Sequence, residues 1–359
     1  MFLSLRKSRA SWRKKAFEFE TEGVKSQMSK QRILSGMRPT GRLHLGHLVG
    51  ALKGWVGLQD EYRCFFMVAD WHALMSEYER SSEIQAFIFD NVADWLACGI
   101  DPDKSTIFIQ SHVPEHLELF TTFAVLTPLG LLERCPTYKE QMRELADRHI
   151  STYAFLGYPV LQAADIALYK AQAVPVGEDQ LPHLELTRQI VRKFNGLYAE
   201  IFPEPKPLLT QIPRLMGLDN RKMSKSYGNF IALSDEPEII KKKVQGMFTD
   251  PKRIKKSDPG HPEPCNVHRY FEVFSPQDKD DLTAACREAR IGCTDCKKML
   301  AEKLCAFLAP IQERRREYLR HKKNLEDILE SGRRKAGEEA SKTMNEVRKA
   351  IGFLGCPTK

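Results

Sequence analysis

The chain has 359 residues, of which 42% are hydrophobic and 28% charged, as in an ordinary globular protein large enough for two domains. Its net charge of +8 suits a polyanionic partner, but solubility alone would explain it equally well. The longest apolar stretch, residues 153–169, is interrupted by Pro159, Gln162 and Asp165, so no membrane span is expected. These features predict a cytoplasmic protein.

Residues 1–30 differ from the rest of the chain. Basic residues such as Arg6 and Lys7 come first, and Glu18 and Glu20 then reverse the sign. There is no apolar signal-peptide core, and the acidic residues argue against an organelle transit peptide. We expect a disordered leader, or a segment upstream of a second start at Met28.

From residue 31 onward, short apolar runs alternate with helical patterns. The runs at 33–36, 63–70 and 106–109 predict buried strands. A helical stripe begins at His44, and Ser82 is predicted to cap a second helix. This order is a βαβαβ unit, so the fold class is α/β with a Rossmann-like parallel sheet. Ligands of such sheets bind beyond the carboxyl ends of the strands.

The second half of the chain becomes increasingly helical. Residues 115–150, 158–170 and 182–194 are predicted to be helical, with short strands at 174–176 and 208–209. Strand patterns stop near residue 230. The predicted domains are the leader 1–30, a catalytic domain 31–230, an all-helical domain 231–332 and a basic helical tail 333–359.

Two short motifs carry the chemistry. His44-Leu45-Gly46-His47 spaces two imidazoles i, i+3 on the first turn of a helix, with a glycine that leaves room for a purine. Lys222-Met223-Ser224-Lys225-Ser226 supplies two lysines on a loop that can reach a polyphosphate. Together they predict an ATP site at the start of the first helix, where backbone N–H groups favour phosphate. Surface histidines and a solvated charge run are the alternatives.

The motifs resemble those of class I aminoacyl-tRNA synthetases, in the tyrosyl/tryptophanyl branch. The bacterial tryptophanyl enzymes are the more similar group, over roughly residues 31–330. The matching segments are residues 39–52, Tyr158–Asp165, Gly177–Gln180 with 185–188, and the lysine loop.

The resemblance implies that ATP with Mg²⁺ activates L-tryptophan for transfer to tRNA(Trp), and that the protein is a homodimer. It implies catalytic roles for His44, His47, Lys222 and Lys225. The implied ATP-binding residues are Arg38, Pro39, Thr40, Gly46, His47, Gly177, Glu178, Asp179, Leu215, Lys222, Met223, Ser224, Lys225 and Ser226.

Amino-acid selection is expected on the helix that contains Tyr158, Gln162 and Asp165, which share a face. A buried carboxylate at 165 can accept the indole N–H, the one polar atom of the tryptophan side chain. The resemblance places Tyr158 and Gln180 on the α-ammonium group. Many relatives have Met at the position of Gln162. A structural role for Asp165, and plain packing for Tyr158 and Gln162, are the alternatives.

Four cysteines are clustered in the helical domain: Cys265, Cys286, Cys293 and Cys296. Four thiolates fit either an iron–sulfur (4Fe-4S) cluster or Zn²⁺, and zinc sites usually show two tight pairs rather than one. A similar pattern holds such a cluster in a subset of tryptophanyl-tRNA synthetases, so we favour 4Fe-4S over zinc or unligated thiols.

Other functions remain open at this stage. The nearest alternative is a tyrosine-specific ligase of the same branch. Nucleotidylyltransferases share the paired histidines but not the complete lysine loop. An inactive tRNA-binding paralogue is disfavoured because both motifs are intact. The basic runs after residue 250 fit solvated surfaces and tRNA contacts equally well.

Overall fold

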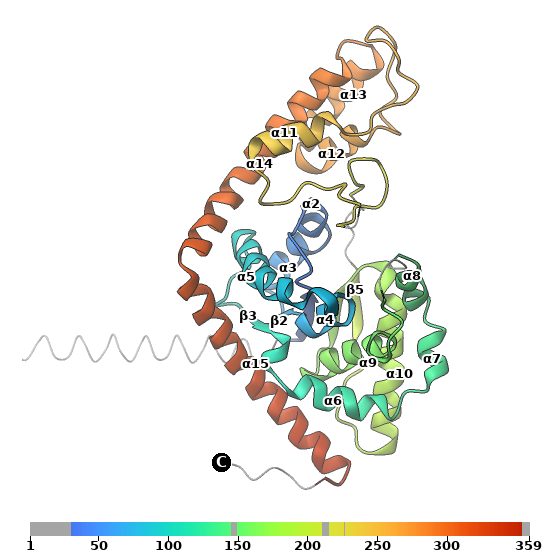
Figure 1. Ribbon diagram of the computed structural model, residues 1–359, viewed down its shortest axis with the longest axis vertical. Coiled ribbons are helices and arrows are strands. Elements are labelled where there is room, and N and C mark those ends of the chain that lie inside the picture. Colours follow the sequence, from blue (N-terminus) through green and yellow to red (C-terminus); the bar gives the residue numbers. More distant parts are fainter. Residues whose placement is uncertain (1–29, 145–148, 210–214, 226, 354–359) are drawn as a thin grey trace, which may run out of the picture.

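The computed structural model describes residues 30–144, 149–209, 215–225 and 227–353 (Figure 1). Ser226 and almost all of the predicted leader lie outside the described residues. A region built around one sheet is joined to an arm of helices by the long helix α14 (Figure 1).

The core of the first region is a five-stranded parallel sheet in the order β3-β2-β1-β4-β5. This confirms the predicted Rossmann-like α/β class. The order reverses between β1 and β4, where such sheets bind their ligands. The strands are β1 (Arg32–Met37), β2 (Arg63–Val68), β3 (Ser105–Ile109), β4 (Ala173–Val176) and β5 (Lys206–Leu209).

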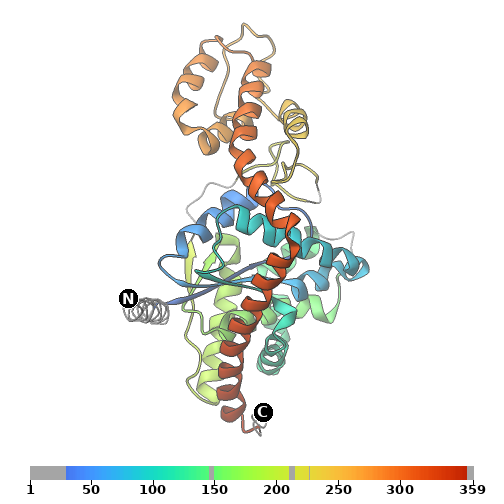
Figure 2. The same cartoon turned by 90° about the vertical axis from the view of Figure 1, so that its left-hand side faces the viewer.

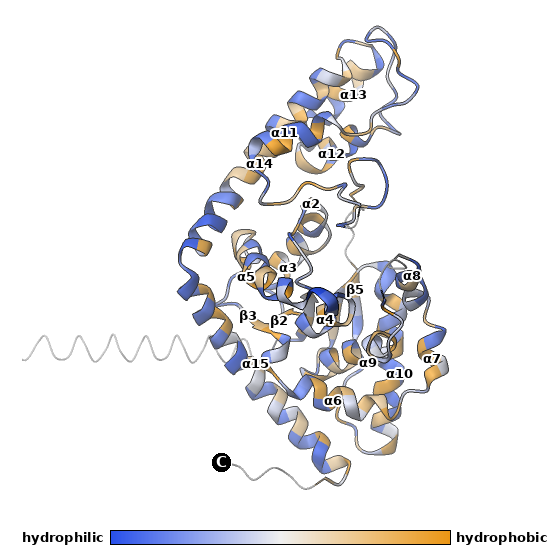
Figure 3. Ribbon diagram, viewed as in Figure 1, coloured by the Kyte–Doolittle hydropathy of each residue, from blue (hydrophilic) through white to orange (hydrophobic). Residues whose placement is uncertain are grey.

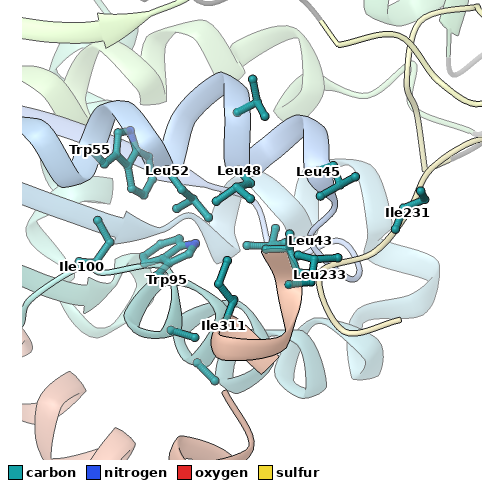
Figure 4. Packing of buried hydrophobic residues seen from close by; sticks show 14 of the residues in the cluster. Leu43, Leu45, Leu48, Leu52, Trp55, Trp95, Ile100, Ile231, Leu233 and Ile311 are labelled. Atoms are coloured by element: carbon teal, nitrogen blue, oxygen red, sulfur yellow. The ribbon is translucent and has the colours of Figure 1, made fainter. Parts of the chain in front are cut away.

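Alternate side chains of β2 enter different halves of the core, as the period of a strand requires. Phe66 and Val68 join one hydrophobic cluster, whereas Phe65 and Met67 join the other. In the first cluster Trp55 stacks on Phe66 with ring centroids 4.6 Å apart. Figure 4 shows the leucines of residues 45–52 packing toward residues from distant parts of the chain, such as Leu233 and Ile311.

Helices cover both faces of the sheet. Residues 115–150, predicted to be helical, form three separate helices because Pro128 precedes one and Pro136 begins the next. The helix predicted from Tyr158 starts earlier, where the Thr152 hydroxyl accepts from the Phe155 N–H at 3.2 Å. The helices are α2 (Leu45–His47), a π-helical turn (Leu48–Leu52), α3 (Lys53–Leu58), α4 (Asp70–Glu77), α5 (Ser81–Ala97), α6 (Glu115–Ala124), α7 (Leu129–Glu133), α8 (Pro136–Glu144), α9 (Tyr153–Leu168) and α10 (Leu181–Leu197), with 3₁₀ turns at Tyr78–Arg80, Gln110–His112 and Glu178–Gln180.

Beyond β5 the regular elements of the described residues are helices, which loops and two isolated bridges separate. Gln312 of α14 donates to the backbone oxygens of Leu233 and Asp235, both at 2.9 Å, and so ties the arm to the connecting segment. The helices are α11 (Pro237–Gln245), α12 (Asn266–Phe274), α13 (Lys279–Arg287), α14 (Cys293–Arg320) and α15 (Lys322–Ala350), with a 3₁₀ turn at Pro276–Asp278.

The last helix returns to the sheet. α15 runs along the side of the region built around the sheet (Figure 2), and its Glu339 pairs with Arg32 of β1 at 3.0 Å and Arg63 of β2 at 3.2 Å. The boundary expected between residues 332 and 333 falls inside this continuous helix. The segment predicted as a tail therefore packs against the region built around the sheet, with Ala336, Ala340, Met344 and Val347 buried.

Hydrophilic residues occupy much of the length of α14 and α15 (Figure 3). The buried positions of α15, such as Leu325, Leu329 and Ala336, recur every three or four residues and form one stripe. Among the described residues, no helix is both long and apolar enough to cross a membrane.

Candidate active site

The two histidines of the first motif cap the helix that they begin. His44 is the N-cap residue, and its Nδ1 accepts from the Gly46 N–H at 3.2 Å. His47 Nδ1 accepts from the His44 N–H, also at 3.2 Å. Because both Nδ1 atoms are acceptors, each neutral ring carries its proton on Nε2. Burial, assisted by the charge of Lys225, lowers the pKa of His44 to about 3 and holds that of His47 well below its usual value.

The lysine loop lies against this motif. A Cβ added to Gly46 would stand 2.9 Å from the Met223 sulfur. Lys225 Nζ donates to the Gly41 oxygen at 3.1 Å, and burial together with Arg38 lowers its pKa to about 8. The structure therefore brings the two distant motifs together.

A cavity of about 670 Å³ opens beside these segments, at the carboxyl ends of β1, β2 and β4. It lies at the point where the strand order reverses, as expected for an open α/β sheet. The predicted site residues that line it are Arg38, His47, Tyr158, Gln162, Asp165, Gly177, Asp179, Gln180 and Lys222.

Pro39, Thr40 and Lys225 instead line a smaller cavity of about 260 Å³. Leu215 is buried in the larger hydrophobic cluster, and Glu178 is exposed in a 3₁₀ turn.

Asp165 is held by three side chains that the sequence did not identify. His72 Nε2 lies 2.7 Å from Oδ2, while His116 Nδ1 at 2.7 Å and Gln110 Nε2 at 2.8 Å reach Oδ1. His116 Nε2 in turn lies 2.8 Å from the Tyr169 hydroxyl. Although burial opposes ionisation, these donors lower the pKa of Asp165 to about 2. A carboxylate has about four acceptor positions, so one position on Oδ2 stays available.

The missed residues follow the buried strands directly. His72 lies just after β2, Gln110 just after β3, and His116 at the start of the next helix. Since parallel strands share one carboxyl edge, polar side chains after several strands converge there. This convergence at one edge of the sheet was the only sequence signal that could have identified His72, Gln110 and His116.

A second polar network also lines the cavity. The Tyr158 hydroxyl is 2.9 Å from His183 Nε2, and His183 Nδ1 is 3.0 Å from Gln180 Oε1. Gln180 Nε2 donates to Asp179 Oδ2 at 2.8 Å. His183 was not predicted, and burial lowers its pKa to about 4.

Residues 26–309 match the family of class I tRNA synthetases for tryptophan and tyrosine (W and Y). The chain belongs to this family. The tryptophan–tRNA ligase of Thermotoga maritima is 51% identical over 326 residues, covering 90% of this chain and 99% of the relative. That of Aquifex aeolicus is 44% identical, covering 90% of this chain and all (100%) of the relative.

A crystal structure gives the same fold. The tryptophanyl-tRNA synthetase of Campylobacter jejuni, solved with ADP and tryptophan, superposes with a TM-score of 0.82 at 32% identity. The alignment covers 90% of this chain and 100% of that structure. The class I synthetase fold therefore extends through both the sheet and the helical arm.

The four clustered cysteines of this class I synthetase share one neighbourhood in the arm. Cys265 caps α12, Cys286 lies in α13, and Cys293 and Cys296 occupy the first turn of α14. Burial, with the charges of the other three, raises the pKa of Cys296 to about 12. Within residues 30–144, 149–209, 215–225 and 227–353, however, no group of three or more His, Cys, Asp or Glu side chains is placed to hold a metal ion.

Proposed function

We propose that this synthetase is a tryptophan–tRNA ligase: with ATP it converts L-tryptophan to tryptophanyl-adenylate, then transfers the tryptophanyl group to tRNA(Trp) for protein synthesis. One observation carries the proposal. The Nε2–H donor of His47 and the ammonium group of Lys222 line one cavity together with an anchored carboxylate, Asp165. The first two suit a nucleoside triphosphate and the third suits an indole N–H.

The ATP half of the site acts by position and charge. The tryptophan carboxylate attacks the α-phosphorus in line and expels pyrophosphate, without a covalent enzyme intermediate. The neutral rings of His44 and His47 donate from Nε2 to phosphate oxygens, and Lys222 and Lys225 neutralise the charge that develops on pyrophosphate.

The remaining ATP contacts are proposed from the resemblance to class I synthetases. Arg38, Pro39 and Thr40 lie beside the phosphates. Gly177, Glu178 and Asp179 hold the ribose hydroxyls, and Leu215 borders the adenine. Gly46, Met223, Ser224 and Ser226 complete the proposed ATP-binding set. Mg²⁺ would be held by the ATP phosphates and water, and would supply further positive charge against the pyrophosphate.

The amino-acid half selects tryptophan. Asp165 keeps one acceptor position open toward the cavity and has no proton to donate, since its pKa is about 2. An indole N–H fills this position, while a ring without a donor leaves it unpaired, and such sites discriminate strongly. Tyr158 and Gln180 accept from the α-ammonium group. Gln162 lines the same cavity.

The helical arm serves tRNA. We assign residues 31–230 to catalysis and residues 231–332 to the region that meets the anticodon end, with α15 bracing the two. A homodimer in the cytoplasm is the expected state of an enzyme with this role.

For the four cysteines we propose a 4Fe-4S cluster with a structural or tRNA-recognition role. Thiolates around one zinc ion must all reach a single centre at about 2.3 Å. Zinc sites usually show two tight pairs of cysteines, and here only Cys293 and Cys296 form such a pair, which favours the cluster over zinc. Arg253 Nη1, 3.9 Å from Cys286 Sγ, adds a positive charge that suits thiolate ligands. Anaerobic purification with iron, sulfide and zinc analysis tests this.

ATP–pyrophosphate exchange tests the activity. Exchange that requires L-tryptophan and is not driven by L-tyrosine supports the proposal. Exchange driven by tyrosine would assign the chain to the tyrosine-specific ligases, and no exchange with either amino acid would indicate an inactive tRNA-binding paralogue.

A further inference from the structure

Four consecutive polar side chains lead from the protein surface to the cavity. Asp179, Gln180, His183 and Tyr158 are joined by hydrogen bonds of 2.8, 3.0 and 2.9 Å in that order. All four line the large cavity. The first three come from the turn after β4 and the start of α10, whereas Tyr158 comes from α9.

The carboxylate at one end fixes the direction of every bond. Asp179 can only accept, so the amide nitrogen of Gln180 must face it and the amide oxygen must face His183. That oxygen is an acceptor, so His183 carries its proton on Nδ1. Its Nε2 then holds a lone pair, and the Tyr158 hydroxyl must donate to it.

The neutral state of His183 supports this assignment. The side chain is 1% exposed, and burial, together with the charge of His72, lowers its pKa to about 4 although Asp179 acts in the opposite direction. Its ring also packs edge-on against the ring of Tyr158, with centroids 5.2 Å apart and planes at 86°. The histidine is therefore neutral and carries its proton on Nδ1.

We propose that His183 is a positioning residue for the α-ammonium group of the substrate, because it draws the Tyr158 proton away from the cavity. The Tyr158 oxygen then presents only lone pairs, and the second lone pair of Gln180 Oε1 stays free. An ammonium group has three donors and no acceptor, so it matches two such oxygens. This inference rests on the proposed function and gives His183 a role that acts through Tyr158.

The fixed direction of these hydrogen bonds also explains why the site prefers an ammonium group to a hydroxyl. If His183 carried its proton on Nε2, the Tyr158 oxygen would accept from it and could direct its own proton into the cavity. A ligand with a hydroxyl in place of the ammonium group would then bind as well. With the direction fixed by Asp179, the pocket favours a cation at this position.

The test compares two ligands that differ only in the ammonium group. L-Tryptophan has it, and indolepropionate shares the ring and the carboxylate but lacks it. In His183→Phe, which keeps an aromatic ring against Tyr158, the dissociation constant of L-tryptophan is expected to rise about tenfold. That of indolepropionate is expected to stay within about twofold. In exchange kinetics, KM for tryptophan should rise while KM for ATP stays unchanged.

Two further variants separate positioning from packing. His183→Gln restores an acceptor for the Tyr158 hydroxyl and should recover part of the tryptophan affinity. Thr187→Val, one turn along α10, removes only a hydrogen bond to the His183 backbone oxygen and should leave the ratio of the two ligands unchanged.

Equal losses for both ligands in His183→Phe, no loss for either, or a selective loss in Thr187→Val would overturn the positioning role. A wild-type protein that does not bind tryptophan would instead overturn the proposed function. Tryptophan binding by the wild-type protein is measured first, so failure of the proposed function is distinguished from failure of the positioning role.

Discussion

Arg315 of α14 donates to Asp94 and to Asp90 of α5, both at 2.8 Å, and so fastens the helical arm to the catalytic region. Asp94 is 1% exposed, and burial raises its pKa to about 7 even though Arg315 acts to lower it. The arginine is therefore what allows this carboxylate to be charged inside the interface.

Arg315→Met is expected to destabilise the protein, because removing one partner of a buried pair costs about 3 kcal/mol. The pKa of Asp94 rises further without the arginine, so the loss should be larger at pH 8 than at pH 6, where the carboxyl can take up a proton. Calorimetric midpoints at the two pH values measure this. Asp94→Asn combined with Arg315→Met should recover part of the loss, and an unchanged midpoint in the single variant would contradict the role of the pair.

A glycine sets how closely α15 approaches the edge of the sheet. A Cβ added to Gly332 would lie 1.7 Å from the Ile107 backbone oxygen of β3, and that backbone cannot move aside without breaking strand pairing. Gly332→Ala is therefore expected to lower the thermal midpoint strongly. Gly337 is the matched control on the same helix: nothing lies within 4 Å of its added Cβ. Gly337→Ala should stabilise the helix, by up to about 1 kcal/mol.

The sequence predicted the parts of this protein that depend on local periodicity and on short motifs. Apolar runs marked the strands, and the spacing of His44 and His47 identified a helix start that the structure places in contact with Met223. The limits of individual helices were less accurate. Nothing in the apolar pattern indicated that Thr152 would cap α9.

The partners of Asp165 could not be found in this way. His72 precedes it by 93 residues and His116 by 49, and no period links them to the carboxylate. Each residue looks like an ordinary polar residue after a strand. Only the sheet order, which brings the ends of β2 and β3 over α9, makes them neighbours. His183 was missed because its proposed role depends on which ring nitrogen carries the proton. That position is set by a hydrogen-bond chain from the Asp179 carboxylate, which no sequence pattern shows.

His116 is expected to act on tryptophan through Asp165. His116→Phe removes one donor from Oδ1, so the carboxylate loses orientation and a second acceptor position opens. The kcat/KM for tryptophan should fall more than tenfold, by about 2 kcal/mol. The benzothienyl analogue, which has sulfur in place of the indole N–H, should lose far less. Parallel losses for the two substrates would show that His116 only supports the core.

His47→Asn should slow adenylate formation with little effect on tryptophan binding. The asparagine oxygen can replace Nδ1 as the acceptor for the His44 N–H, so the helix start is kept while the Nε2–H donor is lost. Loss of one such donor costs about 3 kcal/mol, or roughly 100-fold in rate. Pre-steady-state adenylate formation gives the rate, and equilibrium fluorescence titration gives tryptophan affinity. A normal rate would remove His47 from the catalytic set.

Lys225 predicts how ATP affinity depends on pH. Burial and Arg38 lower its pKa to about 8 in the free protein, and a bound triphosphate must raise that pKa because it stabilises the ammonium form. The stabilisation of bound ATP by this group is therefore complete below pH 8 and declines as the pH rises through the higher pKa of the complex. Binding near pH 8 should also take up protons, which calorimetry in buffers of different ionisation enthalpy detects. Lys225→Arg, which stays charged, should bind ATP without this proton uptake. Equal uptake in the two proteins would assign the titration to another group.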